Sequence, residues 1–375
     1  MIASNVHQPL TSKVIDLLRF PLAAFVVVEH IFNFNDINIA GNIISVTNYP
    51  ILNHTVTFVT AFFSTNSVPI FYFISGYLFF LGTDNFSKTV YRKKLQKRFH
   101  SLFIPYIVWN TLALILLLIS SSPLFSAVYS NGAFTPSLRG LLSCYWSFDK
   151  SYLFQIPFAG NVSPVNAPLW FVRNLMVAVL LTPAIHCILK RLRYCAVIAM
   201  GAIWIAVSYS GVDPLRLANT LFFFSWGACL SINKVDFTES FGRVFSFSMV
   251  LYPLLALAYI VCSRISPQYA FFLKQANIIA GVLFACNLAA WLLKNNRCTV
   301  NTFLASSSFF IYVAHILICG KIQKGLLYIL KPAGDAAITA IYTATILLTI
   351  FLLLAVFRFM KRFTPRLLRA TTGRD

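Results

Sequence analysis

The chain has 375 residues, of which 58% are hydrophobic and only 11% are charged. Soluble domains carry about 25% charged residues, so this composition excludes an ordinary soluble fold and indicates a protein whose solvent is lipid. The formal net charge is +20, from 30 Lys and Arg against 10 Asp and Glu; because no segment is left over for a soluble domain, we attribute the excess to membrane-flanking loops and exclude nucleic-acid binding.

Ten apolar segments are long enough to cross a bilayer, for which about 20 residues are needed. We therefore expect an all-α integral membrane fold with helices at residues 15–34, 54–82, 101–122, 168–189, 195–212, 214–232, 244–263, 271–293, 303–324 and 336–357. The first segment is too long for a cleaved signal and contains Arg19, so we expect a retained helix. The second is long and is expected to tilt or break near Pro69.

Lys and Arg divide unequally between the two sets of loops. With a cytoplasmic N-terminus, the inside loops hold 20 of the 30 cations, the outside loops hold 8, and the other two lie within helices. Cytoplasmic loops collect Lys and Arg, so both termini are expected in the cytoplasm. The domain organisation that follows is a cytoplasmic N-terminus at 1–14, one membrane domain at 15–362 with a long external loop at 123–167, and a basic cytoplasmic tail at 363–375.

Two ionisable residues, Arg19 and His30, lie inside the first helix. An Arg at the centre of a span costs about 2.5–3.5 kcal/mol on insertion scales. Their spacing puts both side chains within about 20° on one helix face and about 16 Å apart along it. Such a stripe suits a reaction whose donor and acceptor come from opposite sides, since His is a general base near neutral pH and Arg binds phosphate. Alternatively, Arg19 snorkels and His30 bonds a neighbouring helix.

Other polar residues fall at similar depths. Arg173 in the fourth predicted helix and His315 in the ninth both lie near the level of His30, either as parts of one site or as interhelical hydrogen-bonding groups. Ser75, followed by Gly76, sits in an apolar run, where close helix packing is a better explanation than a nucleophile because no adjacent base is visible.

A basic run spans residues 91–100. It can touch anionic lipid, and it can also clamp a polyanion such as coenzyme A. The sequence leaves both roles open. The eight Cys are scattered without a C-x-x-C pair, so neither a metal site nor a disulfide framework is expected.

Taken together, five short motifs in order resemble the acyltransferase-3 family of membrane acyltransferases. The motifs are Arg19 with His30; Phe71 to Tyr77, which includes Ser75; Lys94 and Arg98 leading to Pro105, Tyr106 and Trp109; Leu169 to Leu175, which includes Trp170 and Arg173; and Phe309, Tyr312 and His315. One departure is clear. Many members carry Arg-x-x-Arg in the basic stretch, whereas here Arg98 is followed by Phe99, His100 and Ser101, so the second Arg is missing.

The resemblance implies an enzyme of a bacterial cytoplasmic membrane that transfers acyl groups, often acetyl or succinyl, from cytoplasmic acyl-coenzyme A to hydroxyls of surface glycans or lipid-linked sugars. It implies no permanently bound cofactor, because acyl-coenzyme A is a substrate. It also implies roles for residues. His30 would be the base or acyl relay, Arg19 would stabilise charge on the donor, Lys94, Lys97 and Arg98 would hold the donor's phosphates, and Arg173 and His315 would complete the site.

Two other functions fit the composition. A transporter or exporter of a glycan would also bury charges in many helices, although paired repeats with broken helices are not visible in the sequence. A receptor or assembly subunit without catalysis is the third reading, because the basic stretch lacks its second Arg. The sequence does not decide whether the chain forms a homo-oligomer.

Overall fold

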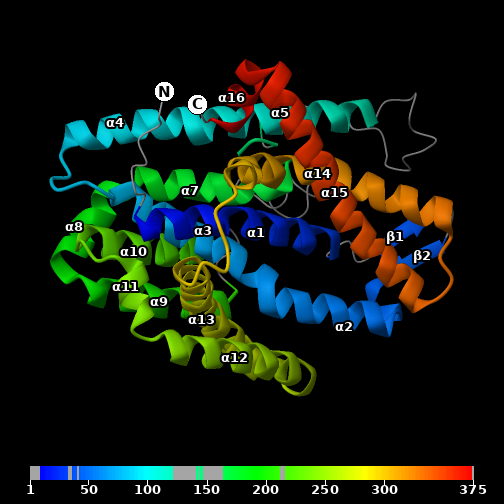
Figure 1. Cartoon of the computed structure of the whole chain (residues 1–375), viewed down its shortest axis with the longest axis horizontal. Coiled ribbons are helices and arrows are strands. Elements are labelled where there is room, and N and C mark those ends of the chain that lie inside the picture. Colours follow the sequence, from blue (N-terminus) through cyan, green and yellow to red (C-terminus); the bar gives the residue numbers. More distant parts are fainter. Residues whose placement is uncertain are drawn as a thin grey trace.

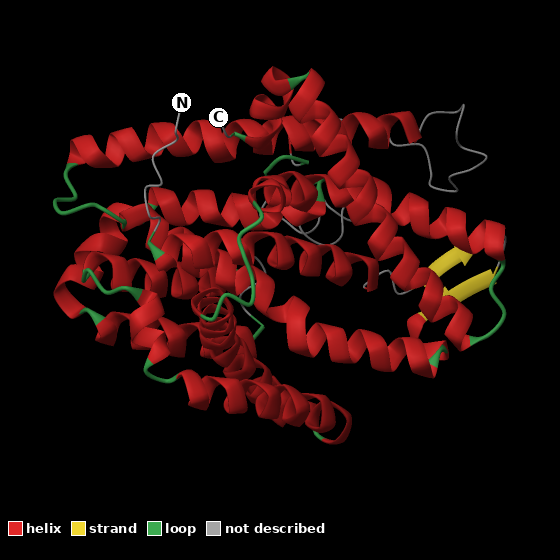
Figure 2. Ribbon diagram, viewed as in Figure 1, coloured by secondary structure: helices red, strands yellow, loops and turns green. Residues whose placement is uncertain are grey.

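The computed structural model of the chain describes residues 9–32, 36–39, 42–120, 141–142, 144–146, 164–211 and 216–373. Helices make up almost all of this part, and the expected all-α membrane-type fold is confirmed (Figure 2). The exception is one antiparallel hairpin of β1 (Asp36–Ile39) and β2 (Asn42–Ser45), in which Asp36 pairs with Ser45. Most of the expected external loop at 123–167 lies outside the described residues.

Every one of the ten apolar segments falls on one or two helices. The α-helices are α1 (Leu10–Phe32), α2 (Pro50–Val59), α3 (Thr65–Phe80), α4 (Lys88–Arg98), α5 (Ile104–Ser120), α7 (Trp170–Leu180), α8 (Thr182–Leu192), α9 (Tyr194–Tyr209), α10 (Leu217–Ile232), α11 (Phe237–Gly242), α12 (Phe245–Ile265), α13 (Pro267–Lys294), α14 (Thr302–Leu330), α15 (Asp335–Phe363) and α16 (Pro365–Thr372). Short 3-10 turns form η1 (Val46–Asn48) and η5 (Ala167–Leu169), and π-helical turns form η2 (Thr60–Ser64) and η3 (Phe99–Phe103).

Not all of these helices could cross a membrane by length and composition alone. Within the described part of the chain, six stretches qualify, and a seventh does if Ala167–Leu180 and Thr182–Leu192, bent by 64°, form one span. Helices α9 and α10 have 16 residues each, and α1 carries the ionisable side chains Asp16, Arg19 and Glu29. Ten spans with both ends in the cytoplasm therefore stay a prediction.

The second expected span is irregular at a different place from the one we expected. Pro69 lies inside α3, and the break in regular helix is the π-helical turn η2, upstream of it. A proline lacks the amide hydrogen that would bond the carbonyl four residues back, and its ring crowds that carbonyl. A π-helical turn in the preceding residues changes the local hydrogen bonding. The Thr65 hydroxyl bonds the Thr60 carbonyl at 2.8 Å within this irregular stretch.

Helix α1 runs through the middle of the molecule and packs on α3, α13, α14 and α15 (Figure 1). Its residues Val14, Ala23, Val27 and Ile31 are fully buried, as expected for a helix surrounded by others. The start of α1, the end of α3, α8 and α11 lie toward one end of the molecule, at the left of Figure 1. The β1–β2 hairpin, the start of α2 and the end of α14 lie at the other end, so α1 connects the two.

Helices α3 and α10 approach each other closely. A Cβ added to Gly76 would lie 1.9 Å from the carbonyl oxygen of Phe224, and one added to Gly227 would lie 1.9 Å from that of Phe73. Only glycine allows this contact, which is the small-residue packing found between membrane helices. The geometry thus favours the packing explanation of the Ser75–Gly76 pair, and a catalytic Ser75 stays untested.

Candidate functional site

Two histidines from different helices meet beside the end of α1. The ring centroids of His30 on α1 and His315 on α14 are 4.9 Å apart, and the ring planes make an angle of 67°. The two helices run in the same direction and pack along each other (Figure 1). His315 is fully buried, and His30 is partly buried. The structure therefore brings together two of the residues that the sequence predicted at one depth, and we call them the histidine pair.

Hydrogen bonds to the backbone fix the orientation of both rings. Nδ1 of His30 lies 2.9 Å from the carbonyl oxygen of Val26, and Nδ1 of His315 lies 3.2 Å from that of Ile311. A carbonyl oxygen can only accept, so Nδ1 carries the hydrogen in each ring. In the neutral imidazoles, Nε2 then bears the lone pair that a general base needs.

Nε2 of His315 is buried and has no hydrogen-bond partner among the described residues. Leaving a buried polar atom unsatisfied costs about 1–3 kcal/mol. Such atoms are uncommon in folded proteins, and one beside a second histidine marks a place where a substrate group or a proton can be held.

The turn before α7 is attached to α14 next to the histidine pair. The Tyr312 hydroxyl donates to the carbonyl of Pro168, and the Asn166 side-chain amide donates to the carbonyl of Val313 at 3.0 Å. The ring centroids of Tyr312 and His315 are 6.4 Å apart. Tyr312, which the sequence identified as a motif residue, thus positions η5 and α7. Asn166 was missed, although it lies only three residues before the motif that begins with Leu169.

Arg173 is fully buried on α7, and its Nε and Nη2 atoms lie 3.1 and 3.0 Å from Oδ1 of Asn174. Phe171, two residues earlier, packs on Tyr312 with ring centroids 5.6 Å apart and accepts a hydrogen bond at 3.3 Å from the Tyr72 hydroxyl. The structure thus connects Arg173 to the histidine pair through Phe171 and Tyr312. Arg173 itself lies in a buried polar cluster with Asn174 and Thr220.

Trp170 contacts Arg216, which the sequence placed among the cations of the outside loops without indicating a role. The guanidinium carbon of Arg216 lies 5.0 Å from the Trp170 ring centroid, within the range of a cation–π contact. Arg216 precedes α10 and has a left-handed backbone with φ of 56°. Arg216 and Trp170 thus join the start of α10 to the first turn of α7.

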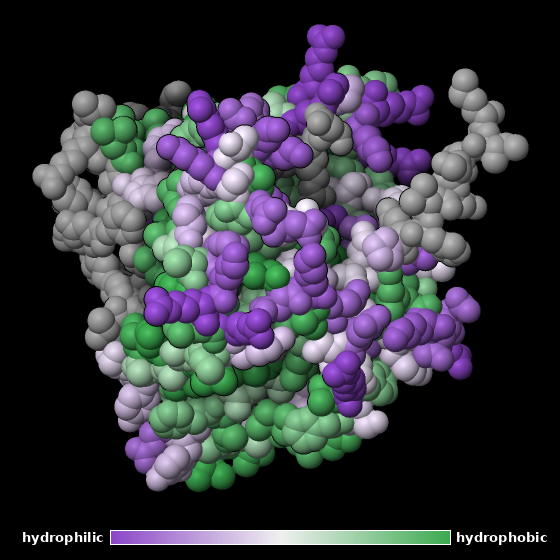
Figure 3. All heavy atoms as spheres, turned by 90° about the vertical axis from the view of Figure 1, so that its left-hand side faces the viewer, coloured by the Kyte–Doolittle hydropathy of each residue, from purple (hydrophilic) through white to green (hydrophobic). Residues whose placement is uncertain are grey.

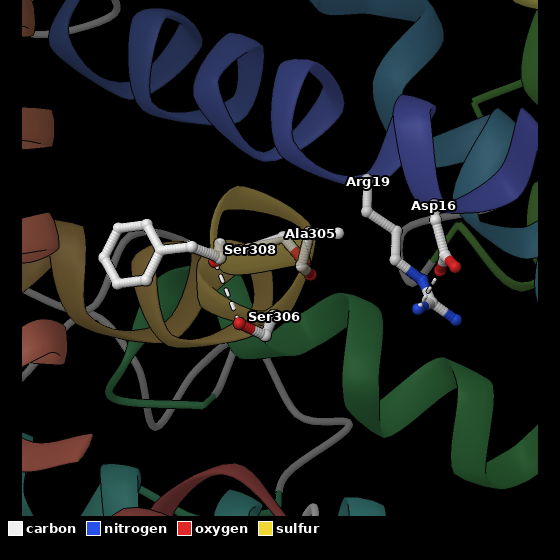
Figure 4. Close-up of polar contacts among 6 residues, drawn as sticks. Asp16, Arg19, Ala305, Ser306 and Ser308 are labelled. Atoms are coloured by element: carbon white, nitrogen blue, oxygen red, sulfur yellow. Dashed lines mark hydrogen bonds and ion pairs between the residues drawn. The ribbon is translucent and has the colours of Figure 1, made fainter. Parts of the chain in front are cut away.

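Arg19, the other member of the α1 stripe, forms an ion pair on its own helix. Its Nη1 lies 2.6 Å from Oδ1 of Asp16, and the two side chains are 27% and 23% exposed. Figure 4 shows the guanidinium turned back toward Asp16, beside the first turns of α14 that carry Ser306 and Ser308. Asp16 was missed, although a spacing of three residues on a helix is a signal for such a pair.

Arg98 opens onto a cavity of about 1230 Å³ between the end of α3, α4, η3 and α16. Its lining includes six side chains that are or can become cationic, and we call it the basic cavity: Lys93, Lys94, Lys97, Arg98, His100 and Arg369. Figure 3 views the left-hand end of Figure 1, where hydrophilic side chains gather over the upper part of the surface. All three residues predicted to bind the donor therefore line one cavity.

The three predicted donor-binding residues differ in their surroundings. Nζ of Lys94 lies 2.5 Å from the Phe79 carbonyl oxygen and 5.3 Å from the Phe79 ring centroid. Lys94 thus binds the C-terminal turn of α3, where a cation stabilises the helix end, and part of its role is structural. Lys97 is exposed and Arg98 is partly buried.

Two further motif residues, Ser75 and Tyr77, lie on α3 and do not line the basic cavity. Tyr77 is buried and meets Phe237 of α11 edge to face, with ring centroids 5.0 Å apart. The structure places this motif in the packing between α3, α10 and α11.

Comparison with known proteins gives two findings. A family model described as an acyltransferase domain matches residues 13–359. The chain is also similar to the succinoglycan biosynthesis protein ExoH of Rhizobium meliloti (strain 1021), with 24% identity over 337 residues that cover 87% of this chain and 84% of that protein. No solved structure matches the chain significantly.

Proposed function

Because the chain belongs to the acyltransferase-3 family, we propose that this membrane acyltransferase moves an acetyl group from acetyl-coenzyme A to a hydroxyl of a surface polysaccharide or lipid-linked sugar. We place it in a bacterial cytoplasmic membrane. The observation that carries the proposal is the histidine pair, in which the backbone bonds leave Nε2 of each neutral ring able to take a proton. Acyl transfer to a hydroxyl needs such a base.

The basic cavity supports the choice of donor. Coenzyme A carries a diphosphate and a further phosphate, and Arg and Lys side chains bind such groups through charge-assisted hydrogen bonds. The cavity volume of about 1230 Å³ exceeds the range of about 300–1,000 Å³ for sites of drug-sized ligands, so a large anion fits it better than a small one. Arg98 and Lys97 both line this cavity.

The chemistry at His30 follows from its lone pair. If His30 acts as a base, Nε2 takes the proton of the acceptor hydroxyl. The hydroxyl oxygen bonds to the carbonyl carbon of the thioester, and the carbon–sulfur bond breaks. The coenzyme A thiolate leaves and is protonated. As a relay, Nε2 bonds to the same carbon first, coenzyme A leaves, and the acyl group then passes to the hydroxyl. Both routes need the Nε2 lone pair of His30, which the hydrogen bond from Nδ1 to the Val26 carbonyl leaves available.

The name of the relative supports a saccharide acceptor. ExoH is described as a succinoglycan biosynthesis protein, and the match covers most of both chains. We propose that the acceptor reaches His30 from the end of the molecule where the β1–β2 hairpin lies, opposite the basic cavity. Donor and acceptor would then enter from the two ends of α1.

The experiment is acetyl transfer by the purified protein in liposomes, with radiolabelled acetyl-coenzyme A and the polysaccharide of the source cell, read by mass spectrometry of the glycan. The wild type should acetylate the glycan, and His30→Ala should lose at least about 100-fold in rate, since general bases contribute about 10²–10⁴-fold. His54→Ala is the matched control, because His54 is exposed on α2 and contacts Arg264. Full activity of His30→Ala, or glycan crossing the membrane with no acetyl-coenzyme A consumed, would contradict the proposal.

A further inference from the structure

The last helix, α16, lies beyond the residues that match the family model and folds back onto α5. Nε1 of Trp109 on α5 donates to the carbonyl of Thr371 at 2.8 Å. Leu368, Thr371 and Thr372 are buried in this contact. The segment that the sequence suggested was a basic tail is therefore a packed helix with a defined position.

The end of α16 meets the turn that follows Arg98. A Cβ added to Gly373 would lie 2.5 Å from Cα of Ser101 and 2.7 Å from the carbonyl oxygen of His100. Gly373 also has φ of +64°, in the left-handed region where glycine is favoured. The chain thus needs glycine here to bring its C-terminal end against η3.

This packing carries a cation into the basic cavity. Arg369 lines the cavity together with Ala370 and Gly373, opposite Lys97 and Arg98 of α4. Ser101, which follows Arg98 by three residues, lines the same cavity and carries no charge. The helix α16 therefore adds a cation to those that α4 and His100 of η3 bring to the cavity.

We infer that α16 forms one wall of the donor site and that Arg369 binds a phosphate of the donor. The inference rests on the proposed function for the identity of the donor, and the chemistry it names is a phosphate or diphosphate group. Arg suits that group because its planar fork makes paired, charge-assisted hydrogen bonds. A lipid headgroup offers the same chemistry, so the test separates the two sources.

Arg366 is the matched control. It lies on the same helix, three residues before Arg369, and is also exposed, but it does not line the cavity. A general effect of positive charge on the protein or on lipid binding should appear in both Arg366→Gln and Arg369→Gln. An effect on the cavity should appear only in the second.

The experiment is calorimetric titration of coenzyme A into the full-length protein in phosphatidylcholine nanodiscs. Arg369→Gln should weaken the Kd about tenfold, and Arg366→Gln should leave it within twofold. Trp109→Phe, which keeps a ring against Phe310 and removes the bond to Thr371, should also weaken binding and tests α16 without changing a charge. This second variant keeps the inference testable if Arg369→Gln does not fold.

The outcomes separate the inference from the proposed function. Wild-type binding of coenzyme A with an unchanged Kd in Arg369→Gln would overturn the inference and leave the proposed donor intact. Wild-type binding of inorganic pyrophosphate but not coenzyme A, lost in Arg369→Gln, would support the phosphate role and overturn the donor. If Arg369→Gln lost the association of the protein with phosphatidylglycerol while its Kd for coenzyme A stayed unchanged, Arg369 would bind a lipid headgroup and not the donor. Binding of neither probe by the wild type would overturn both.

Discussion

The two ends of the α1 stripe have different surroundings. Around His30 the structure is closely packed, with the fully buried His315 in ring contact and both Nδ1 atoms bonded to backbone carbonyls. Toward the other end the structure is more open: the side chains of Arg19 and Asp16 are partly exposed, and the basic cavity of about 1230 Å³ lies beside α4 and the end of α3. Proton transfer needs fixed geometry, whereas holding a polyanion needs several charges and tolerates small displacements. We therefore expect substitutions at the packed end to change kcat and those at the open end to change KM.

The largest effect after His30 itself is expected at His315. His315→Phe keeps an aromatic ring against His30 but removes Nε2, and it should lower kcat about 100-fold because the buried lone pair at the histidine pair is lost. The measurement is the steady-state rate of glycan acetylation as a function of pH. The KM for acetyl-coenzyme A should stay within twofold.

His315→Asn is the companion variant, since it keeps a polar group at the same position. We expect it to recover part of the rate. A His315→Phe enzyme with a wild-type pH–rate profile would show that His315 has only a packing role. The proposal that proton transfer takes place at this end of α1 would then lose the support of His315.

A smaller effect, on binding alone, is expected at Arg98. Arg98→Gln should raise the KM for acetyl-coenzyme A about tenfold with kcat nearly unchanged, because Arg98 lines the basic cavity and one charge-assisted bond to phosphate would be lost. The difference should shrink as salt is raised from 0.05 to about 1 M, which shortens the screening length to about 3 Å. A lowered kcat at unchanged KM would contradict the assignment of the cavity to the donor.

Lys97 should matter less than Arg98. It is exposed on α4, and exposed charges are worth little because water and salt screen them. Lys97→Gln should raise the KM about two- to threefold, measured with the same assay and salt series. An effect as large as that of Arg98→Gln would mean that the cavity is less open to solvent than the structure indicates.

The smallest effect is expected at Asp236, which attaches the start of α1 near the open end. Burial raises the pKa of this carboxyl, but hydrogen bonds from the Thr11 hydroxyl, the Thr238 hydroxyl and backbone amides outweigh it and hold the pKa below its ordinary value. A group with a lowered folded pKa contributes stability above its unfolded pKa, near 3.9, and loses it as pH falls through the folded value.

The measurement for Asp236 is thermal unfolding of the wild type and Asp236→Asn between pH 7 and pH 3. The wild type should be more stable at pH 7, by less than about 1 kcal/mol because the group is partly solvent-screened. The difference should shrink as pH falls below the unfolded pKa of about 3.9 toward the lower folded value. A difference that grows as pH falls would contradict the hydrogen-bonding arrangement around Asp236.

The parts of the fold and of the candidate site that could be predicted are those set by residues close together in the sequence. The helices follow from apolar segments long enough to cross a bilayer, and helix geometry placed Arg19 and His30 on one face. The meeting of His30 and His315 followed from their similar depths in two spans, and the Asp16 partner of Arg19 was available from its spacing but was missed.

What could not be predicted depends on contacts between distant parts of the chain. The bond from Trp109 to Thr371 joins residues 262 apart, and nothing in the sequence near Arg369 indicates that α16 folds back onto α5. Arg216 is a single cation in a short link, and only the packing of α10 against α7 brings it to Trp170. The π-helical turn η2 ends five residues before Pro69, so the proline indicated an irregular helix in this region but not the kind of turn or its position.

The most direct test of the two-ended site is one kinetic comparison, the kcat and KM for acetyl-coenzyme A of His30→Ala and Arg98→Gln measured side by side in liposomes. We predict that His30→Ala loses at least about 100-fold in kcat with KM unchanged. We predict that Arg98→Gln raises KM about tenfold with kcat nearly unchanged. If both variants change the same constant, or if His30→Ala keeps the wild-type kcat, the separation of α1 into a donor end and a chemical end is contradicted.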